Sequence, residues 1–105
     1  MKLDLQHRIA IPLVLIKSTG LDKYLSECRE LRLAVKEDHM VLFKPCEEND
    51  GIEYCDVVNV DSKNRICLHA SVWDMIGKGS DFEHFEYFVS ALRDHLIIRW
   101  KKGDV

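Results

Sequence analysis

Large apolar residues recur at every second position in two long stretches of the chain, and this period of two predicts β-strands. In the first stretch, residues 31–44, the alternation runs through LRLAVKEDHMVLFK. A turn at Glu37-Asp38 places Leu33 opposite Leu42, so that the large apolar side chains of both arms share one face. We therefore expect an antiparallel hairpin over these residues.

The second stretch, residues 52–73, predicts another hairpin, paired along both arms, with its loop at residues 62–64. This loop length places Val60 opposite Ile66 and collects the apolar side chains of both arms on one face. Asn64 tolerates the left-handed backbone conformation that such a loop requires. The opposite face then carries Glu53, Cys55, Val57, Asn59, Cys67, His69, Ser71 and Trp73.

Apolar residues recur at helical spacing in residues 19–31 and 81–96, which predicts two helices. At the start of the first helix, Thr19 and Asp22 have the spacing of a capping box. The second helix presents a stripe of aromatic and aliphatic side chains that we expect to cover a sheet. This stripe consists of Phe82, Phe85, Phe88, Val89, Leu92 and Leu96.

The remaining apolar stretches predict one strand near each end of the chain. Residues 9–16 are apolar on both faces of a strand, but Pro12 has no amide hydrogen and interrupts the ladder. Residues 96–100 predict a last strand at the sheet edge. No internal repeat is apparent. The element order predicts a single α+β domain over residues 1–105: a mainly antiparallel sheet of four to six strands, with two helices packed on one face.

The composition is that of a soluble globular protein, with 47% hydrophobic and 31% charged residues. A formal net charge of −3 does not favour nucleic acids as partners, because phosphate binding needs a positive field. The charge is unevenly distributed: residues 46–92 carry 10 acidic and 3 basic side chains, whereas residues 93–105 carry 2 acidic and 4 basic ones. This segregation favours a charged partner.

The four cysteines are expected to be free thiols in a reducing cytoplasm. The N-terminal sequence lacks the features of a secretory signal, because Asp4 and Pro12 interrupt its apolar residues. The apolar run at residues 9–16 is too short for a transmembrane helix, which takes about 20 residues. We therefore expect a cytoplasmic protein that does not enter a membrane and packs most of its cysteines as small hydrophobic residues.

Cys67 and His69 are the candidate pair for metal binding or nucleophilic catalysis, because they share one face of the predicted strand. The sequence has neither the CxxC nor the HxxxH spacing that would complete a zinc site. A cysteine in mid-strand also lacks the helix N-terminus or neighbouring cation that lowers a thiol pKa. The acidic residues after Pro45 do not have the spacing of a calcium loop. We expect no catalytic residue, no metal site and no cofactor, and retain an enzyme that uses Cys67 and His69 as an alternative.

The preferred hypothesis is a small protein–protein interaction module, such as an inhibitor, an adaptor or an immunity-type binder. Aromatic residues are typical of interface anchors, and the exposed hairpin face adds polar candidates. The expected partner-binding residues are Asn59, His69, Trp73, Tyr87 and Trp100.

A second alternative is a nucleic-acid-binding protein, since cations beside an aromatic ring are typical of single-strand binding. Its expected contact residues are Arg93, Arg99, Lys101 and Lys102, beside Trp100. The sequence leaves the partner and the oligomeric state open.

Overall fold

The computed structural model describes residues 2–77 and 85–101 and confirms the predicted α+β class. In chain order the elements are β1 (Arg8–Ala10), α1 (Leu13–Ser18), α2 (Leu21–Glu27), β2 (Glu30–Val35), β3 (His39–Phe43), the 3₁₀ helix η1 (Glu47–Asn49), β4 (Asp56–Asn59), β5 (Arg65–Cys67), α3 (Ala70–Met75), β6 (Tyr87–Leu92) and β7 (His95–Trp100). Among these described residues, every helix is too short or too polar to span a lipid bilayer.

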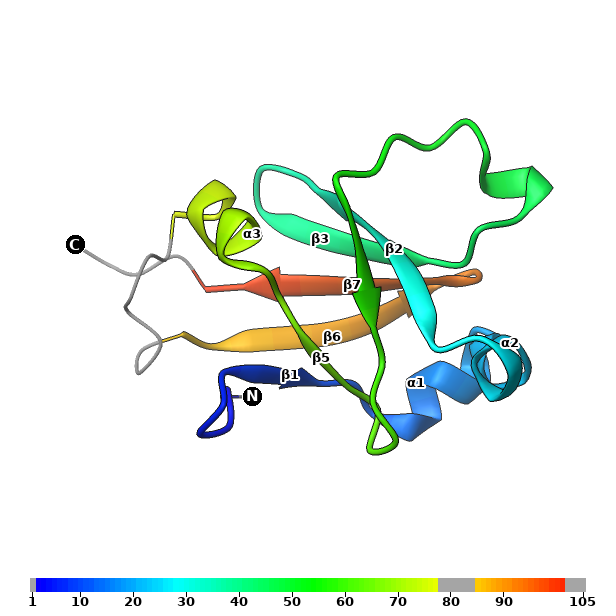
Figure 1. Ribbon diagram of the computed structural model, residues 1–105, viewed down its shortest axis with the longest axis horizontal. Helices are drawn as coiled ribbons and strands as arrows, with labels where there is room; N and C mark the ends of the chain where they lie inside the picture. The colour runs from blue at the N-terminus through cyan, green and yellow to red at the C-terminus, as the bar shows by residue number, and fades with distance from the viewer. Residues whose placement is uncertain (1, 78–84, 102–105) are drawn as a thin grey trace.

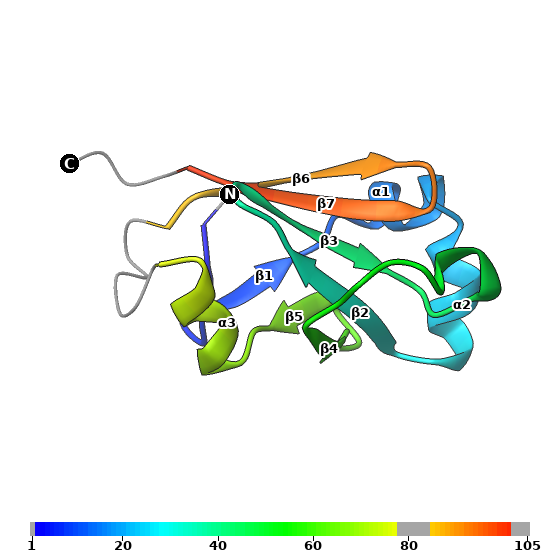
Figure 2. The same cartoon turned by 90° about the horizontal axis from the view of Figure 1, so that it is seen from above.

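Five strands form the main antiparallel sheet, in the order β4-β2-β3-β7-β6, and β1 pairs with β5 in a separate two-stranded ribbon. The ribbon and α3 lie on one side of the main sheet, while α1 and α2 lie side by side at the far end of the molecule (Figures 1 and 2). The hydrophobic core fills the space between these layers and includes Ile9, Leu33, Ile66 and Trp73.

The first predicted hairpin is confirmed as β2 and β3. Leu33 pairs with Leu42, and the Lys36 amide donates a hydrogen bond of 2.8 Å to the His39 carbonyl across the Glu37-Asp38 turn. Both leucines are fully buried. Alternation was sufficient to set the pairing here, because a shift by one residue would expose every large apolar side chain of the hairpin.

The second predicted hairpin is confirmed only at its loop. Val60 bridges to Ile66, and Asn64 has a φ of 60°, as expected. Beyond this point the arms separate, because β4 pairs with β2 in the main sheet and β5 pairs with β1 in the ribbon. The prediction of continuous pairing is therefore wrong. Each arm finds its partner elsewhere in the chain, which local alternation cannot reveal.

Residues 70–75, predicted as the end of a strand, form the helix α3. Its two buried residues are Val72 and Trp73, which are adjacent in the sequence and would point to opposite faces of a strand. Trp73 therefore packs in the core instead of on the predicted exposed face. Six residues are too few to distinguish a period of two from a period of 3.6.

Residues 8–18 form a short strand and then a helix, instead of one interrupted strand. Pro12 is the N-cap of α1, a position where a missing amide hydrogen breaks no helical hydrogen bond. The helix predicted over residues 19–31 is confirmed as the shorter α2.

The predicted capping box is wrong. The Thr19 hydroxyl donates hydrogen bonds to carbonyl oxygens of the preceding helix, those of Leu15 and Ile16, and thereby closes the end of α1. The N-cap of α2 is Gly20, whose φ of 76° turns the chain between the two helices.

The helix predicted over residues 81–96 is wrong in its described part. Residues 87–100 form the hairpin of β6 and β7, with its turn at Arg93-Asp94. Tyr87 and Val89 pack toward the core while Phe88 is exposed, which is the alternation of a strand. In addition, β7 lies inside the main sheet and not at its edge. Residues 81–84 of the predicted helix lie outside the described residues.

The chain contains an internal repeat, so the expectation of none is also wrong. The segments DLQHRIAIPLVLIKSTG (residues 4–20) and DSKNRICLHASVWDMIG (residues 61–77) align without a gap but share only four identical residues. Their conformations agree element by element. Each begins with a turn that contains a residue of positive φ, which is His7 in the first segment and Asn64 in the second. A three-residue strand and a six-residue helix follow in both. Each segment ends on a glycine of positive φ, 76° at Gly20 and 74° at Gly77.

The repeat continues into the two hairpins, where β2 and β3 correspond to β6 and β7. Equivalent residues pair with each other at two points: Ile9 with Ile66 in the ribbon, and Val41 with Ile97 in the main sheet. Antiparallel pairing of a strand with its own equivalent is what a local two-fold relation between repeats produces. Both sheets therefore contain strands from both halves of the chain.

Candidate functional site

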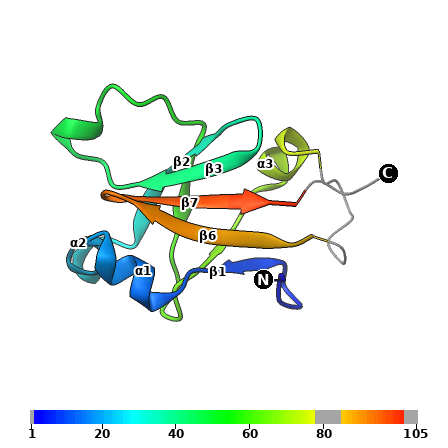
Figure 3. The ribbon, with the colours of Figure 1, turned by 180° about the vertical axis from the view of Figure 1, so that it is seen from behind.

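The main sheet turns one face toward the core and the other away from it. Because side chains alternate along a strand, the pairing of the five strands identifies the residues that point away. We call this surface the outer face. It consists of Glu30, Arg32, Ala34, His39, Val41, Phe43, Val57, Asn59, Phe88, Ser90, Leu92, His95, Ile97 and Arg99. Figure 3 views β3, β7 and β6 from this side, with α3 behind the sheet.

The outer face has exposed apolar side chains along the β6 border. Phe88 is 59% exposed and Leu92 is 57% exposed, although both lie in the regular strand β6. Beside them Ile97, in the neighbouring strand β7, is 8% exposed and forms part of an apolar floor. Single exposed apolar residues are common on protein surfaces, but an apolar group on an open sheet face is typical of a contact surface.

The segment between β3 and β4 covers another part of the outer face. The ring of Tyr54 meets that of Phe43 edge-on, with 6.5 Å between their centroids, and the Arg32 guanidinium lies 4.7 Å from the centroid of the Tyr54 ring. On its other side Phe43 contacts the His95 ring at 5.8 Å. Tyr54 and His95 thus cover Phe43, whereas the part of the outer face formed by β6 and β7 is left uncovered by this segment.

The charge of the outer face differs from that of the whole chain. Among its strand residues the cations are Arg32 and Arg99, and the one acidic side chain is Glu30. Arg99 is exposed and lies directly opposite Phe88 in the β6–β7 pair. The open part of the face therefore combines apolar contact area with a positive charge, in a chain whose formal net charge is −3.

The three aromatic residues predicted to bind a partner lie in the core. Trp73, Tyr87 and Trp100 are all buried, and the Tyr87 hydroxyl accepts a hydrogen bond of 2.8 Å from the Ala10 amide. The ring of Phe85 packs edge-on against Trp73, with 5.1 Å between centroids. The prediction that these three are exposed anchors is wrong. The helix assumed for residues 81–96 placed Tyr87 off the apolar stripe, and the strand assumed for residues 70–73 placed Trp73 on the outward face. Trp100 was expected in a strand at the sheet edge, but β7 lies inside the sheet.

The other two predicted contact residues, Asn59 and His69, are both exposed. Neither lies beside the exposed apolar residues of β6. Asn59 lies at the end of the edge strand β4. His69 precedes α3, and its Nδ1 lies 2.5 Å from the Asp56 Oδ2. Burial acts to raise the pKa of Asp56, but the hydrogen bonds from His69 and from the Val57 amide outweigh it and lower the pKa. This pair fixes the orientation of the imidazole ring.

Cys67 lies opposite Arg8 in the ribbon and is exposed. All four cysteines are free thiols, and none of them is fully buried, contrary to the expectation that most pack as small hydrophobic residues. In the described part of the chain, Cys67, His69 and Asp56 do not form a group whose ligand atoms all lie within 4.8 Å of one another. The geometry therefore adds no metal ligand to the pair Cys67 and His69.

The cations predicted to bind nucleic acid lie at opposite ends of one hairpin. Arg93 is in the β6–β7 turn, whereas Arg99 and Lys101 lie at the far end of β7, roughly 20–25 Å away at the rise of a strand. Trp100, the expected stacking ring, is buried. Lys102 lies outside the described residues. The structure thus separates these side chains instead of assembling them into one patch.

The two turns that begin the repeats are joined by four charged side chains. Arg8 Nε lies 2.7 Å from Asp4 Oδ2, and Arg65 Nε lies 2.9 Å from Asp61 Oδ2. Longer contacts of 3.7 and 3.8 Å cross between the turns, from Arg65 to Asp4 and from Arg8 to Asp61. Because two positive and two negative charges balance, this network is suited to hold the ribbon together.

Sequence patterning missed Phe88 and Leu92, the exposed apolar residues of the outer face, and the contact of half-buried Arg32 with Tyr54 in the covering segment. A usable signal was present, because Asp94-His95 repeats Asp38-His39 and thereby makes residues 31–36 the counterparts of residues 87–92, with Leu31 and Leu33 matching Tyr87 and Val89. Comparison with protein-family models, with curated proteins and with solved structures finds no match to this chain.

Proposed function

We propose that this protein is a small protein-binding module whose contact surface is the β6–β7 part of the outer face. The observation that carries this proposal is the exposure of Phe88 and Leu92 on β6, a strand at the end of the main sheet. An edge strand with exposed large apolar side chains promotes association, and proteins usually protect such an edge with charges or cover it. Here the free thiols are compatible with a cytoplasmic location, which is part of the proposal.

The partner that fits this surface is a protein offering apolar side chains flanked by carboxylates. Phe88 and Leu92 supply the apolar contact area, and Arg99 supplies a charge directly beside Phe88. Arg93, in the turn that follows Leu92, adds a second exposed cation. Complementary charges at the border of a contact set its specificity and its rate of association more than its affinity.

The test compares partner capture by the wild type and two double variants. Phe88→Ala/Leu92→Ala removes apolar area from the proposed surface, whereas Leu13→Ala/Val14→Ala removes it from α1, where both residues are also exposed. A partner captured from lysate is purified, and its direct affinity for all three proteins is measured together with the effect of Arg99→Glu. Sedimentation of the isolated chain shows whether a second copy occupies the surface.

The proposal predicts a purified partner whose affinity falls at least about ten-fold with the β6 variant, as truncation of well-packed interface residues typically produces. The α1 variant should bind like the wild type, and Arg99→Glu should weaken binding at low salt. Equal binding by the wild type and the β6 variant would contradict the proposal. Equal loss with the α1 variant, or self-association as the sole interaction through β6, would also contradict it.

A further inference from the structure

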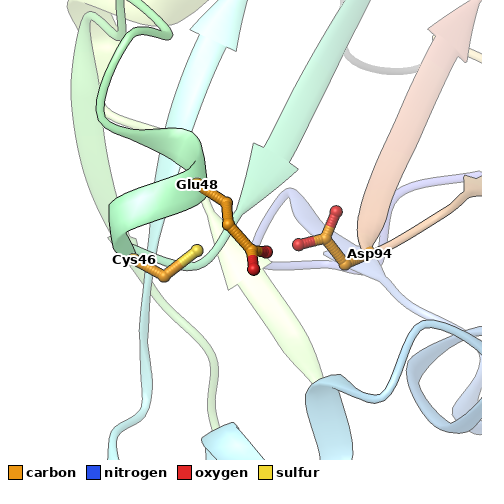
Figure 4. A group of neighbouring side chains, drawn as sticks. All are labelled: Cys46, Glu48 and Asp94. Carbon is orange, nitrogen blue, oxygen red and sulfur yellow. The ribbon is translucent and has the colours of Figure 1, made fainter.

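Three side chains of types that can bind metals come from distant parts of the chain and meet beside the β6–β7 turn. Cys46 and Glu48 belong to the segment around η1, and Asp94 is the second residue of the turn. The Cys46 Sγ and one carboxylate oxygen each of Glu48 and Asp94 all lie within 4.8 Å of one another. Figure 4 shows the Glu48 and Asp94 carboxylates pointing toward each other, with the Cys46 thiol on the same side of the segment.

The backbone that carries these side chains is fixed by a residue that is not part of the group. Asn49 is 4% exposed, and its Nδ2 donates a hydrogen bond of 3.0 Å to the Lys44 carbonyl. Its Oδ1 faces the Nε2 of His95 at 3.3 Å, which joins η1 to the start of β7. The group is therefore positioned by the fold, and its geometry does not depend on contacts between the three ligands.

Two of the three ligand atoms have no other polar partner in the described residues. No hydrogen bond or ion pair there involves the Cys46 thiol or the Glu48 carboxylate, while an oxygen of Asp94 lies 3.3 Å from the His95 Nε2. A cavity of about 550 Å³ opens onto Glu48 and Asp94, and its lining also includes the cations Lys44 and Arg93. Glu48 is exposed, and Cys46 and Asp94 are half-buried, so all three groups can be reached from solvent. Converging carboxylates and a thiol with this access are suited to a cation.

We propose that Cys46, Glu48 and Asp94 bind a zinc-type divalent cation, with solvent at the fourth position. Zinc accepts thiolate and carboxylate ligands in a tetrahedron, in which ligand atoms lie about 3.5 Å apart for bond lengths of about 2.1 and 2.3 Å. Rotation of the side chains would have to move the ligand atoms by roughly 1 Å to bring them from within 4.8 Å of one another to this spacing. The thiolate selects zinc over magnesium and calcium, which take oxygen ligands. His95 is the positioning residue that holds Asp94.

This proposed metal site is separate from the proposed partner-binding surface, because none of its three ligands is one of the exposed apolar residues of β6. A bound ion would connect the segment 44–55 to the β6–β7 turn, two parts of the chain that otherwise meet through Asn49 and His95. Binding would order these ligand groups as a crosslink, and the resulting stabilisation of the folded state would grow with the logarithm of the free metal concentration.

The test uses cobalt(II) alone as a spectroscopic probe and zinc as its competitor, on the full chain. A thiolate ligand gives cobalt a sulfur-to-metal charge-transfer band in the near ultraviolet, whereas carboxylates alone do not. Cys46→Ser removes the proposed thiolate, and Cys67→Ser is the matched control, because Cys67 is exposed on the ribbon. Calorimetric zinc titrations of Glu48→Gln and Asp94→Asn test the two carboxylates, with far-ultraviolet circular dichroism to confirm folding.

The proposal predicts one cobalt per chain, with a charge-transfer band that zinc displaces and that Cys46→Ser abolishes. Each ligand variant should weaken zinc binding at least about ten-fold, the lower end of what is lost on removing even an indirect partner of a metal. Cys67→Ser should match the wild type. Absence of the band in the wild type, its persistence in Cys46→Ser, or its loss in Cys67→Ser would overturn the site. Displacement by magnesium or calcium as readily as by zinc would overturn the role of the thiolate.

Discussion

At the scale of single residues, Asn64 shows how a local conformation follows from residue type. Its φ of 60° lies in the left-handed region, which asparagine enters more readily than most residues because its short amide forms local hydrogen bonds. The Asn64 Oδ1 accepts a hydrogen bond of 3.3 Å from the Arg29 Nη2, and the Asn64 backbone carbonyl accepts one from the Ile11 amide. The backbone at this point is thus fixed from both sides.

We predict that Asn64→Ala lowers the free energy of unfolding by about 1 kcal/mol more than Asn64→Gly does. Both variants lose the side-chain amide, so the difference between them isolates the cost of a β-carbon at positive φ. Denaturant unfolding of the two variants and the wild type measures it. Equal stability of the alanine and glycine variants would show that the backbone relaxes out of the left-handed region.

Residue-scale features that depend on the whole fold could not be predicted in this way. Tyr87 was expected at the surface because a helix was assigned to a segment that forms a strand, and Trp100 because its strand was placed at the sheet edge; both residues are buried. The group of Cys46, Glu48 and Asp94 was also beyond reach of the sequence. Its members come from two loops that approach each other only because β3 and β7 pair in the main sheet.

At the scale of elements, prediction succeeded where one face of a hairpin is buried and its turn is polar. The pairing of Leu33 with Leu42 followed from alternation, because the competing alignment would expose the apolar face. It failed for residues 87–92, where Phe88 and Leu92 satisfy helical and strand spacing equally well. Recognition that Asp94-His95 repeats Asp38-His39 would have identified a second hairpin turn.

The two turns that begin the repeats depend on ionised aspartates, which makes them sensitive to acid. The hydrogen bond from the Arg8 amide, together with the Arg8 guanidinium, holds the pKa of Asp4 below its ordinary value. For Asp61, burial acts to raise the pKa, but hydrogen bonds from Arg65 and Lys63 outweigh it and the pKa is lowered. A carboxyl group with a lowered pKa in the folded state stabilises the fold above its unfolded pKa.

We predict that this contribution is complete at neutral pH and is lost progressively below about pH 5, as protons bind preferentially to the unfolded chain. Asp4→Asn and Asp61→Asn should each lower stability at pH 7 and flatten its dependence on pH between 5 and 3. Asp74→Asn, an exposed aspartate of α3, serves as the control and should keep the wild-type slope. Urea unfolding across this pH range gives the result, and an unchanged slope in both turn variants would contradict it.

At the scale of the whole molecule, the internal repeat does not divide the chain into two separate units. Strands from the two halves pair at the centre of both sheets, in the β1–β5 ribbon and in the β3–β7 contact. The one core cluster likewise includes residues of both halves, such as Leu33 and Trp73. The repeat thus produces one fold in which each half completes the other.

The interleaved halves should therefore unfold together. Leu33 lies in the first half and is fully buried, so Leu33→Ala should destabilise the fold by about 2–5 kcal/mol. Both tryptophans, Trp73 and Trp100, lie in the second half, and their fluorescence reports on that half and on its contacts with the shared core. If the halves form one cooperative unit, the fluorescence midpoint shifts by the same amount as the circular dichroism midpoint. The exposed Leu13→Ala should shift neither. Fluorescence that keeps its wild-type midpoint in Leu33→Ala would mean that the second half is stable without the first.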